Sequence, residues 1–257
     1  LVHASWLPGR QSGHHLVTLQ RAGHDPVSLR VESAEPLRSS LFEIDVDPWK
    51  SARVRCPELA LDLSFDAFTP PIDFGERFDL GDDMRQKHVQ AGVRASGRIG
   101  ADRFRAVPGF RDRSWGPRDM RNMGRLAALL MTGVEEDLFI TVNTMSHRDR
   151  AFSASPDTSL GCIAIGQQVE VFDAPPTIWR NQDGTPACFE FPNGVRVDLD
   201  LSEAFQDGLF LADATSAPDG FPTKDPILQI RMWALAAEAR GYGRMAGSYQ
   251  EGQLFTN

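Results

Sequence analysis

The sequence predicts an all-β protein built from antiparallel strands. Apolar residues recur at every second position in several stretches, which is the spacing of a strand with one buried face. Asp-Gly and Asn-Gly pairs separate some of these stretches, and both pairs favour tight hairpin turns because they tolerate positive φ. Only residues 227–240 have the composition of a long helix. We therefore expect many strands, short turns and few helices.

The first half of the chain contains a strand and a hairpin. Large apolar residues alternate with small or polar ones over 59–66, as they do in a half-buried strand. The same alternation over 93–99 is followed by a Gly-Ala-Asp turn at 100–102 and a second strand-like run at 103–107. Two such runs around a turn predict a β-hairpin.

The second half predicts a meander. A run at 178–180 passes through Gln-Asp-Gly into 187–191, and an Asn-Gly pair then leads into 195–201. The segment 227–240 is rich in alanine, which favours helix. Its apolar residues also alternate with period two, which is typical of a strand, so the residues alone leave both alternatives open here.

Segments rich in Pro, Gly, Ser and Asp predict surface loops at 66–83 and 201–226. A surface or mobile segment is also expected at the N-terminus, where four histidines lack the spacing of a metal site: His3, His14, His15 and His24. Three tryptophans lie in strand-like runs, where large aromatic residues usually pack in a core: Trp49, Trp179 and Trp233.

Length and composition indicate a soluble globular protein. The 257 residues suffice for one large or two modest domains, and 41% of them are apolar and 24% charged. The longest apolar run, 126–131, is far shorter than the roughly 20 residues of a transmembrane helix. We expect no membrane insertion. Isolated Cys56, Cys162 and Cys188 predict reduced thiols in a cytoplasmic protein.

The net charge of −8 argues against nucleic acid as a partner. Residues 94–125 nevertheless contain nine arginines, three aspartates and no lysine, a local charge of +6. One interpretation is a cationic rim that receives an anionic group of a substrate. The other, which we favour for Arg94, Arg98, Arg103 and Arg105, is the solvated face of a strand pair.

A dense motif at 109–119, Gly-Phe-Arg-Asp-Arg-Ser-Trp-Gly-Pro-Arg-Asp, is the most informative feature. Trp115 supplies a large amphipathic wall, and the following Gly-Pro pair predicts a sharp turn. Arginines on both sides should keep the carboxylate of Asp112 ionised and oriented. The pattern fits a site for chemistry or recognition and fits equally a structural corner, in which Trp115 closes the end of a β-domain.

The motif resembles the Arg-Asp-His-x-Trp-Gly signature of the carotenoid 1,2-hydratase group, which is similar to AttH-like proteins and lipocalin-like Diels-Alderases. Four positions match: Arg111, Asp112, Trp115 and Gly116. Arg113 stands where the hydratases have histidine, and residues 138–143 lack the Tyr-x-Asp of their following strand. The resemblance implies two lipocalin-like β-barrel or sandwich domains, here 1–120 and 121–257, and it favours strand over helix at 227–240.

The resemblance also implies a cofactor-independent lyase or isomerase that hydrates, dehydrates, isomerises or cyclises an isoprenoid- or polyketide-like substrate. We expect acid-base chemistry at three residues: Asp112, Arg113 and Trp115. Beside arginines, an ionised Asp112 is better suited to act as a base than as an acid, and the Trp115 ring can stabilise a carbocation. Substrate contacts, including contacts with an anionic or carbonyl group, are expected from Arg111, Ser114, Arg118, Trp179 and Trp233.

Two alternatives from other classes stay open at this point. A non-catalytic carrier of a hydrophobic small molecule is favoured by the arginine at the position of the family's histidine, because lipocalin-like domains also bind ligands without transforming them. A purely structural β-protein is the weaker alternative. No metal and no cofactor is expected in any of these cases.

Overall fold

The structure, a computed structural model, describes residues 2–7, 11–19, 27–75, 78–79, 85–116, 123–147, 156, 158–212 and 227–255. This part of the chain consists of β-strands and one short 3-10 helix, η2 (Pro57–Leu59), and contains no α-helix. The predicted all-β class is therefore confirmed. Contacts divide the chain into two compact units. Unit 1 comprises Leu1–Ala67 and Arg94–Val107, and unit 2 comprises Phe68–Val93 and Pro108–Asn257.

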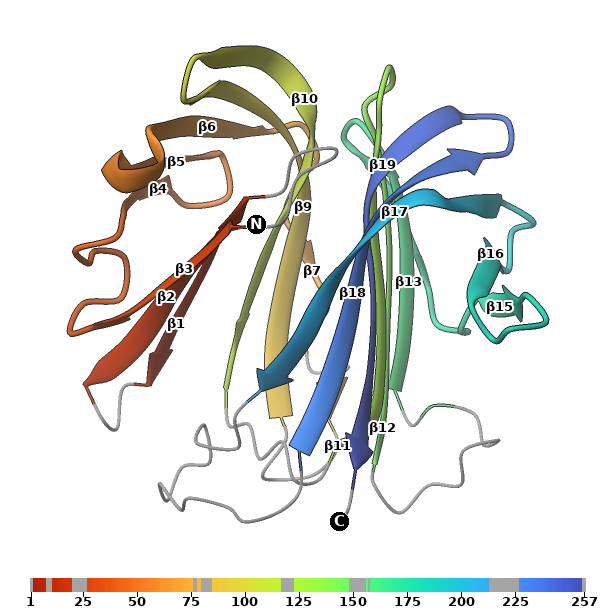
Figure 1. The fold of residues 1–257 in the computed structure, drawn as a ribbon. Helices are drawn as coiled ribbons and strands as arrows, with labels where there is room; N and C mark the ends of the chain where they lie inside the picture. The colour runs from red at the N-terminus through yellow and green to blue at the C-terminus, as the bar shows by residue number, and fades with distance from the viewer. Residues whose placement is uncertain are drawn as a thin grey trace. The chain divides into compact units, whose positions relative to one another are not determined.

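Unit 1 is built from a three-stranded sheet and part of a second sheet (Figure 1). The first sheet consists of β1 (Val2–Leu7), β2 (Ser12–Leu19) and β3 (Val27–Ser33). The second has the order β10-β9-β6-β5-β4, with β4 (Glu43–Asp47), β5 (Ser51–Cys56), β6 (Leu61–Ala67), β9 (Arg85–Ile99) and β10 (Asp102–Trp115). Apolar side chains from both sheets form one core, which includes Val17, Val54 and Leu63. The predicted hairpin of residues 93–107 is confirmed as the turn between β9 and β10.

Two predictions for unit 1 are wrong. The ring of His15 is fully buried and stacks on Phe42 with 4.4 Å between ring centroids, and its Nε2 atom lies 3.1 Å from the carbonyl oxygen of Pro36. The N-terminal histidines are therefore not all on a surface segment. Trp49 lies in the turn between β4 and β5 with φ of +65° instead of in a strand. Single residues without flanking periodicity gave no signal for either placement.

Unit 2 contains a strongly curled sheet of nine antiparallel strands (Figure 1). Its order is β14-β13-β12-β11-β19-β18-β17-β16-β15. The bounds are β11 (Met123–Gly133), β12 (Leu138–His147), β13 (Thr158–Ile165), β14 (Gln168–Phe172), β15 (Thr177–Arg180), β16 (Pro186–Glu190), β17 (Arg196–Ala212), β18 (Ile227–Ala239) and β19 (Gly243–Phe255). The predicted meander of residues 178–201 is confirmed as β15, β16 and the start of β17, and residues 227–239 form the strand that the resemblance favours.

The middle of this sheet is buried on both faces. Leu129 and Met131 of β11 point into one core, whereas Ala128 and Leu130 point into another on the opposite face. This double burial explains the uninterrupted apolar run at 126–131, because a strand covered on both sides has no reason to alternate with polar residues.

Parts of β9 and β10 cover the second face of the sheet within unit 2. Gly92 of β9 lies so close to the sheet that a Cβ atom built on it would be 2.7 Å from Cβ of Phe139 in β12. Farther along, the Thr132 hydroxyl of β11 donates to the carbonyl oxygen of Gly109 at 2.7 Å. The first half of β9 and the second half of β10 therefore cross the sheet over β11 and β12.

The predicted loops are corrected in two places. Within residues 66–83, β6 continues to Ala67 and two short strands follow, β7 (Ile72–Asp73) and β8 (Phe78–Asp79). Ile72 and Phe74 are buried. Residues 201–212 continue β17, with register shifts in its pairing to β18, while 213–226 lie outside the described residues. In both places the apolar residues come in runs too short or too irregular to show a period.

Candidate functional site

The alternation of β10 divides the sequence motif between two faces of the strand. Phe110 packs into the core on the second face of the large sheet, so Asp112 and Ser114 share its side because residues two apart in a strand point the same way. Arg113 and Trp115 take the opposite side, where the guanidinium carbon of Arg113 lies 5.3 Å from the Trp115 ring centroid. Of the three residues predicted to be catalytic, Arg113 and Trp115 therefore lie together, whereas Asp112 lies on the other face of the strand.

Asp112 is paired with a histidine that the sequence motif does not contain. Its Oδ1 atom lies 2.9 Å from Nε2 of His88 on the adjacent strand β9. The Asp112 side chain is 35% exposed and that of His88 is 12% exposed. The carboxylate is therefore accessible to a ligand, and the imidazole is held largely inside unit 2.

Gln90 contacts both members of this pair. Its Nε2 atom is 2.9 Å from Nε2 of His88 and donates to Oδ2 of Asp112 at 3.4 Å. Its Oε1 atom accepts hydrogen bonds from the Thr141 hydroxyl at 2.6 Å and from Nδ2 of Asn143 at 3.3 Å. Because Thr141 and Asn143 both donate to the Gln90 oxygen, the amide nitrogen of Gln90 must face His88 and Asp112.

The two residues that donate to the Gln90 oxygen come from the large sheet and are buried. Thr141 and Asn143 lie on one face of β12, two residues apart, and Nδ2 of Asn143 also donates to the Thr141 hydroxyl at 3.1 Å. Gln90 and Thr141 have no exposed surface, and Asn143 is also buried. A buried polar group is costly unless it is hydrogen-bonded, so these contacts fix one arrangement of the Gln90 side chain.

An aromatic wall adjoins the imidazole. The Phe74 ring is buried, and its centroid lies 5.9 Å from that of His88 at an interplanar angle of 47°. The backbone N–H of Phe74 also donates to the carbonyl oxygen of His88 at 2.9 Å. This segment therefore limits the positions available to the imidazole and excludes water from one of its sides.

The geometry allows His88 to exchange a proton at Nε2 and keep a partner. When Nε2 carries a hydrogen, the Asp112 carboxylate accepts it. When Nε2 carries none, the amide of Gln90 donates to it. Groups that change protonation state without losing their orientation are suited to general acid-base catalysis. We name the set His88, Gln90, Asp112, Thr141 and Asn143 the acid-base network.

The other predicted site residues lie elsewhere. Trp115 is 41% exposed. Arg111 shares its face of β10, and burial, followed by the nearby charge of Arg113, lowers the pKa of Arg111. Trp179 lies on the edge strand β15, is 53% exposed, and donates from Nε1 to Oε2 of Glu190 at 3.2 Å. Trp233 lies in β18 with its backbone opposite Tyr249 of β19. Arg118 lies outside the described residues.

Within the described residues, no group of three or more His, Cys, Asp or Glu side chains is arranged to hold a metal ion. The described part also contains no helix of the length and apolarity that crossing a membrane requires. Cys56, Cys162 and Cys188 are buried and free.

Fold and site together define an all-β protein with a histidine-carboxylate pair. Residues 14–156 match a domain family of unknown function, DUF7064, and the chain belongs to that family. No curated protein sequence matches the chain.

Solved structures show the same fold. A Nitrosomonas europaea protein assigned as AttH superposes with a TM-score of 0.60 at 10% identity, over 96% of this chain and 81% of that chain. Kievitone hydratase from Nectria haematococca gives a TM-score of 0.52 at 10% identity, over 96% and 80% of the two chains. CghA with Sch210972 gives 0.43 at 12% identity, over 100% and 74%. The first two likenesses confirm the AttH-like fold expected from the sequence motif.

Sequence reasoning identified Asp112 but missed four members of the network. The family resemblance draws attention to residues 138–143 only for a Tyr-x-Asp pattern, which they lack, whereas their polar residues, Thr141 and Asn143, stand two apart. His88 and Gln90 show the same spacing at the start of β9. A search for polar pairs at period two inside otherwise apolar strands would find Thr141 and Asn143, whereas His88 and Gln90 follow the polar run 85–87 and give no such signal.

Proposed function

We propose that this protein is a cofactor-independent enzyme of the lyase or isomerase type that acts on a hydrophobic small molecule by acid-base chemistry. The observation that carries the proposal is the contact between His88 and Asp112 above a buried amide that keeps both in place. The AttH-like fold, which kievitone hydratase also has, agrees with it but shows the fold alone.

In the proposed reaction, Nε2 of His88 carries a hydrogen and donates a hydrogen bond to the ionised Asp112, which orients the carboxylate, and the carboxylate takes a proton from a carbon of the substrate. Return of the proton to another carbon gives an isomer. Donation of that proton to a departing hydroxyl group gives an alkene and water. In both cases the protons balance and the enzyme returns to its starting state.

The substrate class follows from the surroundings of the pair. Phe74 presents an apolar wall to His88, and Trp115 with Arg113 stands near the end of the strand that carries Asp112. We assign proton transfer to Asp112 and His88. Arg113 and Trp115, on the other face of β10, are assigned to substrate contacts away from the reacting atoms. This arrangement suits an isoprenoid- or polyketide-like molecule that carries a carbonyl or carboxylate group.

The test is turnover of isoprenoid and polyketide extracts by the purified protein, followed by mass spectrometry. We expect a product isomer, or a product that differs from its precursor by one water molecule. Asp112→Asn and His88→Gln should each lower the rate by about 100-fold, the usual contribution of a general acid or base. Glu238→Gln, at an exposed position of β18, and His147→Gln, at the end of β12, are the matched controls, and both should retain wild-type rates.

A ligand that is bound and recovered unchanged by the wild-type protein and by both site variants would overturn the proposal in favour of the carrier. Equal turnover by wild type, Asp112→Asn and His88→Gln would instead show that a different site performs the reaction.

A further inference from the structure

Unit 1 has an arginine-lined concavity of about 640 Å³ on its second sheet. Its wall is formed by side chains of β5, β6, β9 and β10. The charged residues among them are Arg53, Asp62, Arg98, Arg103 and Arg105. Four arginines and one aspartate give this surface a net charge of +3, although the chain as a whole carries −8.

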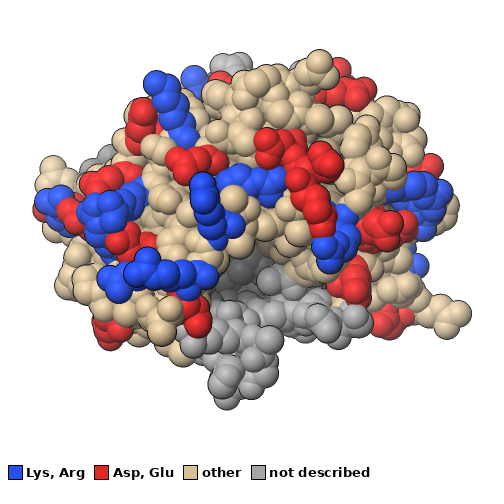
Figure 2. Space-filling view, turned by 90° about the horizontal axis from the view of Figure 1, so that it is seen from above, with Lys and Arg blue, Asp and Glu red and all other residues tan. Residues whose placement is uncertain are grey.

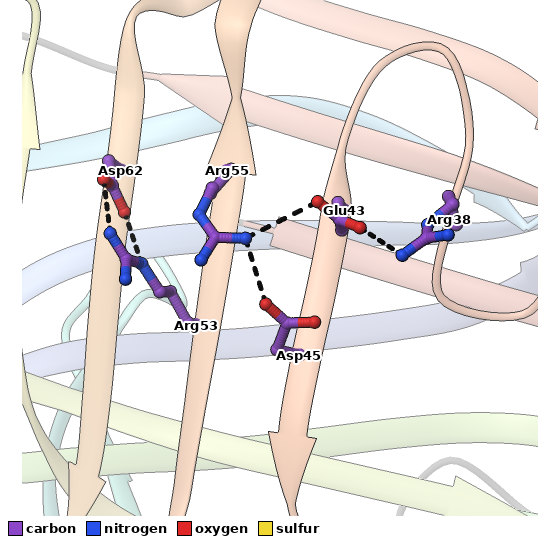
Figure 3. Close-up of polar contacts among 6 residues, drawn as sticks. All are labelled: Arg38, Glu43, Asp45, Arg53, Arg55 and Asp62. Atoms are coloured by element: carbon purple, nitrogen blue, oxygen red, sulfur yellow. Dashed lines mark hydrogen bonds and ion pairs between the residues drawn. The ribbon is translucent and has the colours of Figure 1, made fainter.

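Some arginines of this sheet are neutralised by neighbouring carboxylates, as Figure 3 shows. The guanidinium of Arg53 binds both oxygens of Asp62, each at 2.8 Å. Arg55 donates to Asp45 at 3.0 Å, and Glu43 lies between Arg55 and Arg38. Within the concavity, the ion pair with Asp62 therefore neutralises Arg53.

The three remaining arginines are not neutralised. Arg98, Arg103 and Arg105 are exposed and form no ion pair with another described residue. Asp62 is not available to pair with these three arginines, because Arg53 binds both of its oxygens. The hydrogen bond from Arg53, together with the charges of Arg53, Arg55 and Arg98, lowers the pKa of Asp62. Like charges at close range raise the energy of an empty site, and an anion would relieve this repulsion.

The backbone that lines the concavity departs from regular hairpin geometry at two positions. Gly97 has φ of +143°, and a Cβ atom on it would lie 2.1 Å from the Asp62 carbonyl oxygen. On the facing strand, Ala106 has φ of +53°, and its N–H donates to the Ser96 hydroxyl at 2.9 Å. A positive φ at a non-glycine residue is strained and is retained where the surrounding structure requires it. Irregular positions of this kind redirect side chains along a strand.

Acidic residues limit the length of an anion that can bind. A second hollow of about 560 Å³ shares Arg53 and Ser64 with the first and is lined by Asp45, Asp47 and Asp66. Figure 2 likewise shows acidic and basic side chains interleaved on the face that it draws. A nucleic acid strand running along this sheet would have to pass over the acidic hollow, whereas a small anion would not.

We propose that the concavity of unit 1 binds a small molecule through a phosphate or diphosphate group held by Arg98, Arg103 and Arg105. Guanidinium groups bind phosphate oxygens in pairs, and three of them match the charge of a diphosphate. The adjoining Phe104 ring supplies an apolar surface for the rest of the ligand. The site belongs to unit 1 and does not depend on the acid-base network.

Calorimetric titration with inorganic pyrophosphate tests the proposal. The wild-type protein should bind it and inorganic phosphate more tightly than sulfate at the same ionic strength. The double variant Arg103→Gln/Arg105→Gln should bind pyrophosphate at least about tenfold more weakly, the effect of losing one to two charge-assisted hydrogen bonds. Arg240→Gln removes an exposed arginine of unit 2 and should bind as the wild type does.

Three results would overturn the proposal. The first is no binding of pyrophosphate by the wild-type protein. The second is equal binding by wild type and the double variant with unchanged melting temperatures, which would place the anion elsewhere. The third is binding of a single-stranded oligonucleotide more tightly than pyrophosphate, which would show that the acidic hollow does not limit ligand length. Because the altered side chains are exposed, the variants should fold normally, and the melting curves verify this.

Discussion

At the residue scale, one nitrogen atom of His88 decides what the site can do. Nε2 faces an acceptor, Asp112, and a donor, Gln90. The orientation of Gln90 in turn depends on Thr141 and Asn143. The chemistry of the pair is therefore controlled by residues that never reach a substrate, and Gln90 is a positioning residue in this sense.

Replacing Gln90 by leucine should affect both stability and activity. The change leaves the hydroxyl of Thr141 and the amide of Asn143 without their buried acceptor, which should lower the free energy of unfolding by about 1–3 kcal/mol. Urea unfolding measures it. Gln168→Leu, at an exposed position of β14, should change stability by less than about 0.5 kcal/mol. Equal losses for the two variants would show that the network does not hold Gln90.

Replacing Trp115 by alanine should raise KM about tenfold and leave kcat within about twofold, because a contact made equally in the ground and transition states changes only binding. Steady-state kinetics on the substrate identified by mass spectrometry measure both constants. Val134→Ala, another exposed apolar residue of unit 2, should change neither. A fall in kcat at unchanged KM would show that Trp115 acts on the reacting atoms, which is the role predicted from the motif alone.

The site could be predicted only where its residues are neighbours in sequence. Asp112 stands in a motif, and its environment of arginines, serine and tryptophan is visible in the letters of the chain. His88 comes from the other strand of a long hairpin, so its approach to Asp112 depends on the register of β9 and β10. Each strand also contains a residue with positive φ, Gly97 in β9 and Ala106 in β10, and the sequence around Ala106 does not predict it.

At the element scale, β9 requires a residue without a side chain at Gly92. A Cβ atom there would meet Cζ of Phe68 at 2.5 Å and Cβ of Phe139 at 2.7 Å. Phe139 is fixed in β12, so only a shift of the strand could relieve the clash. Such a shift would move Gln90, two residues away, from its partners on β12.

Gly92→Ala should accordingly lower the free energy of unfolding by about 1–3 kcal/mol, the usual cost of overpacking. Thermal or urea unfolding checks the value. Gly161→Ala is the matched control, because its new Cβ would lie 3.2 Å from the edge of the Phe191 ring, which can turn aside, and we expect a smaller loss. A Gly92→Ala protein as stable as the wild type would mean that β9 is not tightly packed on β12.

Element types could be predicted wherever a period of two extended over several residues, as in β6, β16 and the turn of the β9–β10 hairpin. The predictions failed at β7 and at the second half of β17. β7 is only two residues long, and its Ile72 is held by pairing with β9. In β17 the register shifts interrupt the alternation. Both strands are formed by long-range pairing, which local composition does not encode.

At the scale of the whole molecule, buried acidic groups should make the fold sensitive to alkali. Burial raises the pKa of the Cys162 thiol from 9.0 to about 12, and burial followed by the charge of Glu251 also raises the pKa of Tyr249. Between pH 9 and about 12 the unfolded thiol loses its proton and the folded one keeps it. Stability is therefore fully present below pH 9 and falls as pH rises, with a slope approaching about 1.4 kcal/mol per pH unit.

Unfolding free energies between pH 7 and pH 10.5 measure this slope. Cys162→Ala should be less stable than the wild type at every pH because it leaves a small cavity, but its stability should fall less steeply above pH 9. Parallel curves for the two proteins would show that the thiol does not contribute to the alkaline loss.

The double burial of β11 and β12 has a consequence for hydrogen exchange. A strand with solvent on neither face can expose its amides only when the surrounding layers separate, so the amide hydrogens of residues 127–131 and 139–143 should be among the last to exchange with deuterium. Thr141 and Asn143 belong to this slowly exchanging part, whereas Asp112 lies near the end of β10. The acid-base network therefore connects the slowest-exchanging strands of unit 2 with Asp112, which is accessible near the end of β10.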